Sequence, residues 1–295
     1  MGPIRVTVRR GPLAEAVHRV HAVAVRDGRI VESAGNPELV TYYRSSSKPI
    51  QALPLARERP DVPDVEVAIA CASHRAEPLQ LEAARSLLER APAAETDLEL
   101  GPQDGRGPSL LSHNCSGKHA GFLAVCRARG WPTEGYRLER HPLQQLLLDE
   151  VAALAEVPRD GVPFAIDGCG VLTFGLTLER AATAFGRLPR LDGGERVVRA
   201  MRANPDLLRG PVALDVQLIR SLDGWFAKGG AEGLLCAASA DGLVLALKVM
   251  DGSFRALAPA LTHVLGRLGV EGEALGGLEV TNARGERVGE LRVVQ

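Results

Sequence analysis

A serine and a lysine that stand three positions apart, Ser45 and Lys48, could share one face of a helical turn. The lysine amine could then take the serine's proton as the hydroxyl attacks an acyl carbon, which is the role of histidine in a serine–histidine pair. That role requires a partly neutral amine, so burial and a neighbouring cation such as Arg44 or Lys228 would have to lower the pKa of the lysine from about 10.4 to about 7. The alternative is a serine-rich turn with a solvated lysine.

Lysine is scarce in this chain, because Lys48, Lys118, Lys228 and Lys248 are the only four among 35 basic residues. Arginine supplies the positive charge elsewhere and keeps its proton at any working pH, whereas a buried lysine can lose it. Lys48, Lys118 and Lys228 stand in clusters of glycine, serine, cysteine or histidine. We therefore expect these three to be needed as titratable amines, with codon bias as the alternative explanation.

The five cysteines, at positions 71, 115, 126, 169 and 236, are odd in number and scattered, which argues against a disulfide framework. Cys115 and Cys169 stand in polar, glycine-bearing loops. Two thiolates, one nitrogen ligand and an open position would form a Zn²⁺ site. Inert core packing is the alternative for a free cysteine, and it suits those in apolar runs, Cys126 and Cys236.

The composition indicates a globular chain that acts on a small molecule. With 45% hydrophobic and 24% charged residues over 295 positions, we expect one compact domain over residues 1–295, which could have two lobes. A net charge of −1 gives no electrostatic surplus for binding a nucleic acid or an anionic membrane. Since no apolar stretch resembles a secretory signal or a membrane span, a cytoplasmic location is expected.

The hydrophobic patterns predict a mixed α/β (α+β) fold with antiparallel strand pairs. Short β-like runs bounded by turns predict strands at residues 4–8, 21–25, 29–32, 233–238, 243–250 and 291–294. The apolar run at 65–70 has the length of a strand and is also assigned to one. Helical periodicity, with proline at several starts, predicts helices from Lys48–Pro49 onward and at 78–91, 142–155, 195–203 and 254–268.

Five blocks of the sequence resemble the signature blocks of the rhizobial-type (class 3) L-asparaginases. They occur in that family's order between residues 44 and 233, and they comprise Arg44–Pro54, Cys71–His74, His113–His119, Asp167–Gly170 and Lys228–Gly233. Lys228-Gly229-Gly230 also looks like the Lys-x-Gly strand of serine β-lactamases, and Ser112-His113-Asn114 is similar to their Ser-x-Asn element.

The resemblance implies a largely antiparallel sheet flanked by helices, related to the serine β-lactamase and glutaminase architecture. It also implies hydrolysis of L-asparagine to L-aspartate and ammonia by a homodimer with Zn²⁺ near its active site. For catalysis, Ser45 would pair with Lys48, and Ser73 would pair with Lys228. Three residues would hold the metal, with water in the fourth place: Cys115, Lys118 and Cys169. Four would lie beside the substrate: Arg44, Asp167, Asn114 and Glu232.

The chain departs from the family pattern outside the serine–lysine and cysteine blocks. Leu172 stands where proline is usual, Asn204 stands where histidine is expected before Pro205, and the segment Val212–Val216 is more apolar. These differences bear on substrate preference and efficiency more than on reaction class. The preference for asparagine over glutamine, the identity of the attacking serine and the structural or catalytic role of zinc stay open.

Two other functions fit the same residues. A zinc-stabilised protein could bind an amino acid without catalysis, with the cysteine loops as staples of its fold. An acyl transferase of the β-lactamase type could use the same serine–lysine chemistry, but its substrates lie outside the cytoplasm and no secretion signal is expected here. Release of ammonia from L-asparagine separates both from an asparaginase.

Overall fold

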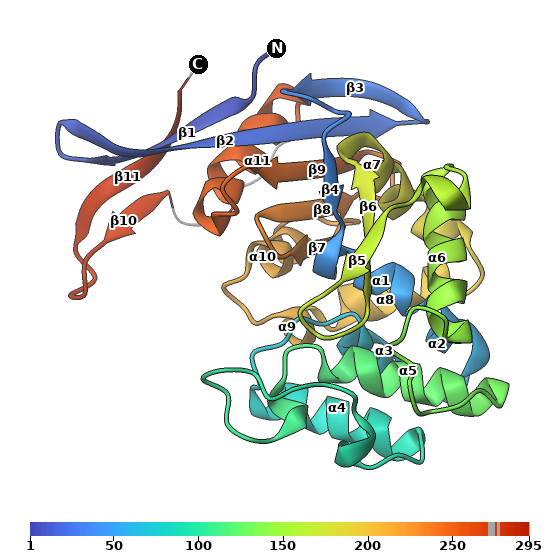
Figure 1. Ribbon diagram of the computed structural model, residues 1–295. Coiled ribbons are helices and arrows are strands. Elements are labelled where there is room, and N and C mark those ends of the chain that lie inside the picture. Colours follow the sequence, from blue (N-terminus) through green and yellow to red (C-terminus); the bar gives the residue numbers. More distant parts are fainter. Residues whose placement is uncertain (271–274, 276–277, 295) are drawn as a thin grey trace. The chain divides into compact units, whose positions relative to one another are not determined.

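The computed structural model describes residues 1–270, 275 and 278–294, within which the chain forms two compact units (Figure 1). The unit that we call the sheet unit comprises residues 1–41, 176–186 and 212–295, and the helix unit comprises residues 42–175 and 187–211. Two of the boundaries fall inside strands, β4 (Val40–Tyr42) and β6 (Leu172–Thr177). Segments far apart in the sequence therefore contribute to each unit.

The sheet unit is built on an antiparallel eight-stranded sheet. Seven strands follow the order β10-β11-β1-β2-β9-β8-β7, and the eighth, β3, pairs with β2. The strands are β1 (Ile4–Arg10), β2 (Leu13–Arg26), β3 (Arg29–Ala34), β7 (Phe226–Gly230), β8 (Leu234–Ala238), β9 (Val244–Val249), β10 (Glu279–Thr281) and β11 (Arg287–Val294). Every residue of β7, β8 and β9 is buried, which accounts for their nearly continuous runs of small and apolar side chains. Strands buried on both faces need cover from other elements.

Helices of the sheet unit provide this cover. α11 (Leu257–Arg267), which follows the 3₁₀ turn η6 (Phe254–Ala256), packs against β1, β2, β9 and β11. α10 (Leu214–Ser221) packs against β7, and α7 (Leu178–Arg187) stacks Phe185 on Phe226 of β7 with 4.9 Å between the ring centroids. The core of this unit therefore lies between the sheet and these three helices.

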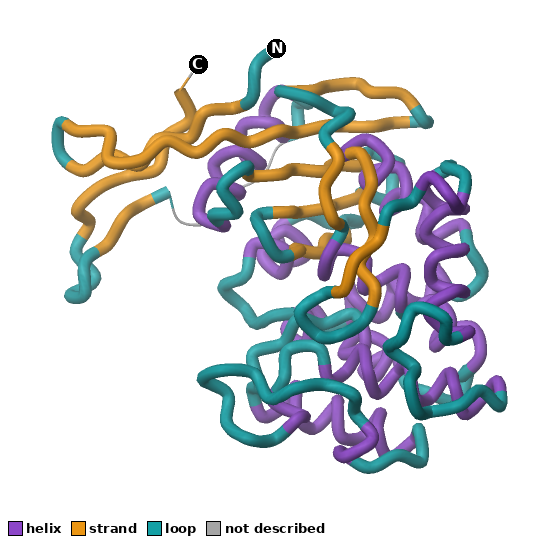
Figure 2. The backbone as a smooth tube through the Cα atoms, viewed as in Figure 1, coloured by secondary structure: helices purple, strands orange, loops and turns teal. Residues whose placement is uncertain are grey.

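The helix unit consists mainly of helices and long connections (Figure 2). Its helices are α1 (Lys48–Gln51), α2 (Leu53–Glu58), α3 (Asp64–Ala70), α4 (Pro78–Arg90), α5 (Ser116–Arg129), α6 (Pro142–Ala155), α8 (Gly194–Ala203) and α9 (Pro205–Leu208). Its 3₁₀ turns are η1 (Arg44–Ser47), η2 (Glu95–Asp97), η3 (Leu110–Ser112), η4 (Arg159–Gly161) and η5 (Leu188–Arg190). β5 (Phe164–Ile166) pairs antiparallel with β6. In the described part of the chain, no helix has the length and apolar character that crossing a membrane requires.

Helices α3 and α5 approach each other closely, and glycine makes this possible. A Cβ atom at position 117 would lie 2.3 Å from the carbonyl oxygen of Ile69, so any residue larger than Gly117 would force the helices apart. α5 begins one residue before Gly117, and α3 leads directly into the segment that contains Ser73. The close packing therefore brings the serine of the second block near Lys118 and the other residues of the third block.

The predicted mixed α/β fold with a largely antiparallel sheet and flanking helices is confirmed. The predicted strands correspond to β1, β2, β3, β8, β9 and β11, and the predicted helices to α1, α4, α6, α8 and η6 with α11. The strand predicted at 65–70 is wrong, because these residues form helix α3. A short apolar run fits a buried helix as well as a buried strand, and residues 66–70 of α3 are all buried.

Candidate active site

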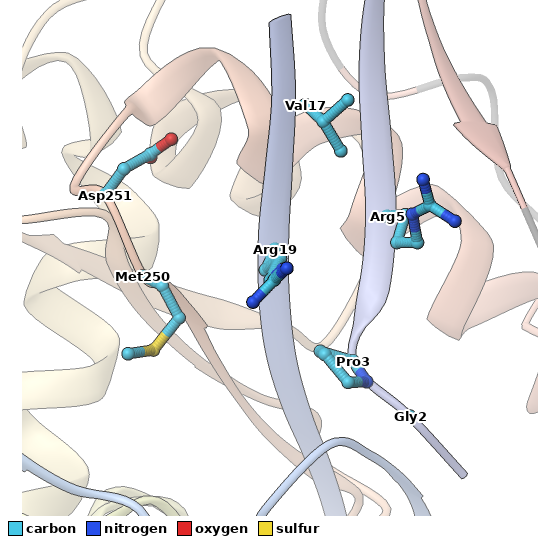
Figure 3. A pocket seen from close by; sticks show the side chains of 7 residues that line it. All are labelled: Gly2, Pro3, Arg5, Val17, Arg19, Met250 and Asp251. Carbon is cyan, nitrogen blue, oxygen red and sulfur yellow. The ribbon is translucent and has the colours of Figure 1, made fainter.

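A hollow in the helix unit borders one of the predicted site residues, Cys169. It has a volume of about 470 Å³ and is lined by Cys169 together with Glu99, Leu100, Gly101, Arg137, Gly168 and Gly170. A hollow of about 890 Å³ in the sheet unit is lined by none of the predicted site residues (Figure 3); its lining is Gly2, Pro3, Arg5, Val17, Arg19, Met250 and Asp251. The hollow beside Cys169 is therefore the one that is relevant to the predicted chemistry.

Lys48 is the buried amine of the helix unit that contacts a serine hydroxyl. Its side chain is 1% exposed, and its Nζ donates hydrogen bonds to Ser73 Oγ at 3.1 Å, to the carbonyl oxygen of Asn114 at 3.4 Å and to the carbonyl oxygen of Ala72. Burial lowers the pKa of Lys48, and the positive charge of Lys118 lowers it further, although the neighbouring cysteine sulfurs oppose this. The structure therefore brings the amine of Lys48, with its lowered pKa, into contact with the hydroxyl of Ser73.

Ser45 occupies a different position from the one that its spacing predicts. It is half-buried in η1, where its carbonyl oxygen accepts the backbone N–H of Lys48. Among the described residues, no hydrogen bond joins the Ser45 hydroxyl to the Lys48 amine, which is directed to Ser73 instead. The 3₁₀ turn and the short helix α1, which has Pro49 at its start, hold Lys48 in this direction. The catalytic roles of the two serines stay predictions.

Arg44 and Asp167 form an ion pair at the edge of this region. Arg44 Nε lies 2.8 Å from Asp167 Oδ1, and the backbone N–H of Arg44 donates to Thr173 Oγ1 at 3.1 Å. Burial raises the pKa of Asp167, but the cations of Lys118 and Arg44 outweigh it and hold that pKa below its usual value. Arg44 has φ of 49°, in the left-handed region that costs about 1–3 kcal/mol for a residue with a side chain. Such strain is typical of functional positions.

Cys115, Cys169 and Lys118 meet in a buried cluster, which we call the thiol cluster. The three side chains come from residues 3–5% exposed, Cys115 Sγ donates to Asn114 Oδ1 at 3.1 Å, and Lys118 Nζ lies 3.1 Å from Cys169 Sγ. The interaction with Cys169 and the cations of Lys48 and Lys118 lower the pKa of Cys115 well below its ordinary value, despite burial. The same interaction and burial raise the pKa of Cys169. Cys115 is therefore the first of the two thiols to ionise.

The remaining predicted residues, Lys228 and Glu232, belong to the sheet unit. Lys228 is fully buried on β7, where its Nζ donates to the carbonyl oxygen of Gly229 at 2.9 Å and lies 3.5 Å from Asp215 Oδ2. Glu232 stands in the turn after β7 with φ of 57°, and its carbonyl oxygen accepts a hydrogen bond from Lys248 at 2.7 Å. The other nine predicted residues all lie in the helix unit.

The sequence as a whole matches the profile of the L-asparaginase II family over residues 6–293. The chain belongs to the L-asparaginase II family. Membership confirms the resemblance of the sequence blocks and assigns the chain to an enzyme class, the asparaginase amidohydrolases. No curated protein matches the chain.

Among solved structures, a β-lactamase from Mycobacterium bovis is similar to this asparaginase-family chain. The match covers 85% of this chain and 95% of the β-lactamase, with a TM-score of 0.45 and 15% sequence identity. At this TM-score it carries no argument about the chemistry of the asparaginase.

The thiol cluster of this asparaginase-family chain has donors that suit Zn²⁺. Among the described residues, no group of three or more histidine, cysteine, aspartate or glutamate side chains could hold a metal, so a third donor must come from the amine of Lys118. Burial lowers the pKa of Lys118, but the Cys169 and Cys115 sulfurs raise it more, so metal binding by this amine must release a proton. Two sulfurs match the soft donors that zinc takes, and the amine nitrogen is an unusual third ligand that is chemically permissible because the dication stabilises the neutral amine.

Two histidines of the asparaginase blocks also belong to this region, although no role was predicted for them. His74 Nε2 lies 2.8 Å from Ser116 Oγ, and burial lowers the pKa of His74 to about 3. His119 Nδ1 lies 2.7 Å from Tyr136 Oη, and burial lowers the pKa of His119 to about 4. Each histidine directly follows a predicted site residue in the sequence, and this position is the signal that could have identified them. Nothing in the sequence around Tyr136 indicated that it would contact His119.

Proposed function

We propose that the chain hydrolyses L-asparagine to L-aspartate and ammonia, with Lys48 as the general base and Ser73 as the nucleophile. The observation that supports this most is the hydrogen bond of 3.1 Å between Lys48 Nζ and Ser73 Oγ. Both residues are buried, at 1% and 7% exposure, and a buried amine with a lowered pKa can be neutral at working pH. The backbone N–H of Ser73 donates to the carbonyl oxygen of Leu208 at 2.7 Å, which fixes the serine in place.

In the first step of the proposed reaction, Ser73 Oγ bonds to the side-chain amide carbon of the substrate while Lys48 takes the hydroxyl proton. The C–N bond then breaks, the leaving nitrogen takes that proton from Lys48, and ammonia departs. A water molecule next attacks the ester and gives one proton to Lys48. L-Aspartate leaves as Ser73 recovers its proton, so that the enzyme returns to its starting state.

Arg44 and Asp167 are the groups that we propose for recognition of the substrate's ends. The guanidinium of Arg44 would bind the α-carboxylate, and the carboxylate of Asp167 would bind the α-ammonium. The two side chains are 26% and 13% exposed, so a ligand can reach them. We also propose that Asn114 lies beside the substrate, because its backbone carbonyl oxygen accepts a hydrogen bond from Lys48. The roles of Glu232 and Lys228 stay predictions from the sequence.

For the metal, we propose that Cys115, Cys169 and Lys118 hold one Zn²⁺. The support is the soft donor set of the thiol cluster. Bound zinc would supply a fixed positive charge next to the reaction and would join two segments that are 51 residues apart at Lys118 and Cys169. We also propose, from the resemblance, that the protein is a cytoplasmic homodimer, which light scattering and cell fractionation test.

Ammonia release from L-asparagine by the purified protein tests the function. The comparison includes Ser73→Ala and Ser45→Ala, each checked for a wild-type melting temperature. Ser73→Ala should lose activity by on the order of 10³-fold or more, as expected for a nucleophile. Ser45→Ala should lose much less. Inactive wild-type protein would refute the proposed reaction, and the reverse order of the two variants would make Ser45 the nucleophile.

A further inference from the structure

The buried imidazole of His119 has a partner on one side and, in the described part of the chain, none on the other. His119 and Tyr136 are both fully buried, with their rings 5.5 Å apart and tilted by 71°, and Phe122 packs against both. On one side of the imidazole, Nδ1 lies 2.7 Å from Tyr136 Oη. On the other side, Nε2 is buried without a hydrogen-bond partner among the residues that the structure describes. A candidate acceptor is the Cys169 sulfur, which lies 3.1 Å from Nζ of the adjacent residue Lys118 and interacts with the imidazole.

The hydrogen bonds around Tyr136 determine which nitrogen of His119 carries a proton. Tyr136 Oη already accepts the backbone N–H of Glu99 at 2.8 Å. Burial raises the pKa of Tyr136, so the phenol keeps its single proton, and the acceptor for that proton is His119 Nδ1, 2.7 Å away. When Nδ1 accepts, the hydrogen of a neutral imidazole is on Nε2, and an imidazolium would also carry a hydrogen there. In either case Nε2 carries a hydrogen, and this buried donor has no acceptor among the described residues.

We propose that Tyr136 and His119 form a positioning pair for the metal site: Tyr136 orients the imidazole, and His119 Nε2–H donates a hydrogen bond to the sulfur of Cys169. This inference rests on the proposed zinc site and adds two residues to it. Cys169 would then have two donors, His119 and the Lys118 amine 3.1 Å from its sulfur, whereas Cys115 Sγ donates to Asn114 Oδ1 at 3.1 Å. Cys169 lies in a loop next to an open hollow, so a donor from the rigid helix α5 would limit its movement.

Residues that hold a metal ligand in place typically change metal affinity by about 10- to 100-fold when they are replaced. We therefore expect His119→Leu, which removes the donor, to weaken metal binding by about that factor. His119→Gln should recover part of the loss, because its amide N–H can reach the position of Nε2. Tyr136→Phe keeps the imidazole but removes the group that orients it, so it should show a smaller loss in the same direction.

The experiment measures Co²⁺ and Zn²⁺ affinity by chelator competition and records the sulfur-to-cobalt absorption band of the full-length protein. His141→Gln is the matched control, since His141 is a buried histidine that caps α6 and accepts a hydrogen bond from the backbone N–H of Leu143. The inference predicts that metal affinity falls from wild type to His119→Gln and again to His119→Leu. The cobalt absorption band should shift in His119→Leu, and the control His141→Gln should bind metal as wild type does.

Three outcomes overturn parts of the proposal in distinguishable ways. If wild-type protein binds metal but His119→Leu binds it equally well with the same absorption band, the positioning role is wrong and the zinc site stands. If Tyr136→Phe equals wild type while His119→Leu does not, the tyrosine has no part in the pair. If wild-type protein binds neither metal, the zinc site itself is wrong, and the positioning role is wrong with it. If His119→Leu does not fold, the metal affinities of His119→Gln and Tyr136→Phe, compared with wild type, still test the positioning role.

Discussion

The amine of Lys48 lies 3.1 Å from the hydroxyl oxygen of Ser73, a residue 25 positions further along the chain. The tight packing of α3 on α5 through Gly117 places the segment of Ser73 where this contact can form. Lys48 in turn is directed away from the serine-rich turn in which it stands. The first two predictions follow from this pair.

Lys48→Arg should nearly abolish turnover while the protein stays folded, because arginine keeps the positive charge but does not give up its proton. Loss of a general base typically costs about 10²–10⁴-fold in rate. Steady-state rates of ammonia release, compared with Lys248→Arg as a control at a lysine of the sheet unit, measure the effect. Turnover within tenfold of wild type would exclude Lys48 as the base.

The pH profile should rise through a pKa well below the ordinary lysine value of 10.5, because burial lowers the pKa of Lys48. Below this lowered pKa the amine is an ammonium and cannot accept a proton, so activity falls as pH falls; above it the amine is neutral and activity reaches a plateau. The profile of kcat/KM for L-asparagine gives the midpoint. A midpoint near 10.5 would contradict the proposed role of the buried amine.

Substrates that lack the α-ammonium or the α-carboxylate should react poorly. Succinamic acid has no ammonium, so Asp167 would lose its contact with the substrate and keep only its ion pair with Arg44. A lost hydrogen bond to a charged group costs about 1.5–3 kcal/mol, which corresponds to a preference for asparagine of about 10- to 150-fold. The ratio of kcat/KM for asparagine and succinamic acid measures this discrimination. Comparable rates on the two compounds would argue against recognition by Arg44 and Asp167.

The purified protein should contain about one zinc per chain, because the thiol cluster offers one set of three donors. Cys115→Ser and Cys169→Ser should lose the metal and melt at a lower temperature, as should wild-type protein after treatment with a strong chelator. Cys126→Ser is the matched control: burial raises the pKa of Cys126 to about 12, which marks it as an inert thiol. Metal content that is unchanged in Cys115→Ser and Cys169→Ser would show that these sulfurs are not ligands.

Gly117→Ala should destabilise the helix unit by about 1–3 kcal/mol or more, because the added Cβ would overlap the Ile69 carbonyl oxygen at 2.3 Å. Gly266→Ala is the control, since this glycine lies in α11 with open space around its Cβ position. There the change should be neutral or stabilising by up to about 1 kcal/mol. Denaturant unfolding of both variants gives the two differences, and equal values would contradict the close-packing account.

Sequence patterns were sufficient to predict the helices and strands that have strong local signals. The helix Pro142–Ala155 was predicted with the bounds that the structure shows, because proline marks its start and a leucine stripe runs along it. The segment 65–70 was assigned to the wrong type, because an apolar run of six residues carries no period that separates a buried strand from a buried helix.

The candidate site was predictable as a set of residues but not as a set of contacts. The blocks contain Lys48, Ser73, Lys118 and Cys169, yet spacing alone favoured Ser45 as the partner of Lys48. Contacts across 25 or 51 residues depend on how helices pack, and no local pattern encodes them. The link between His119 and Tyr136 was missed for the same reason.

The lysines of this chain have a practical consequence for chemical coupling. All four are buried, with 1% exposure at Lys48, 3% at Lys118, 0% at Lys228 and 9% at Lys248, while arginine provides the solvated positive charge. Reagents that acylate amines under mild conditions need a neutral amine that they can reach. In the folded protein no lysine amine is easily reached, because each belongs to a residue that is at most 9% exposed. Acylation of lysine should therefore leave the folded enzyme largely unmodified, including the proposed base, and should occur mainly on chains that have unfolded.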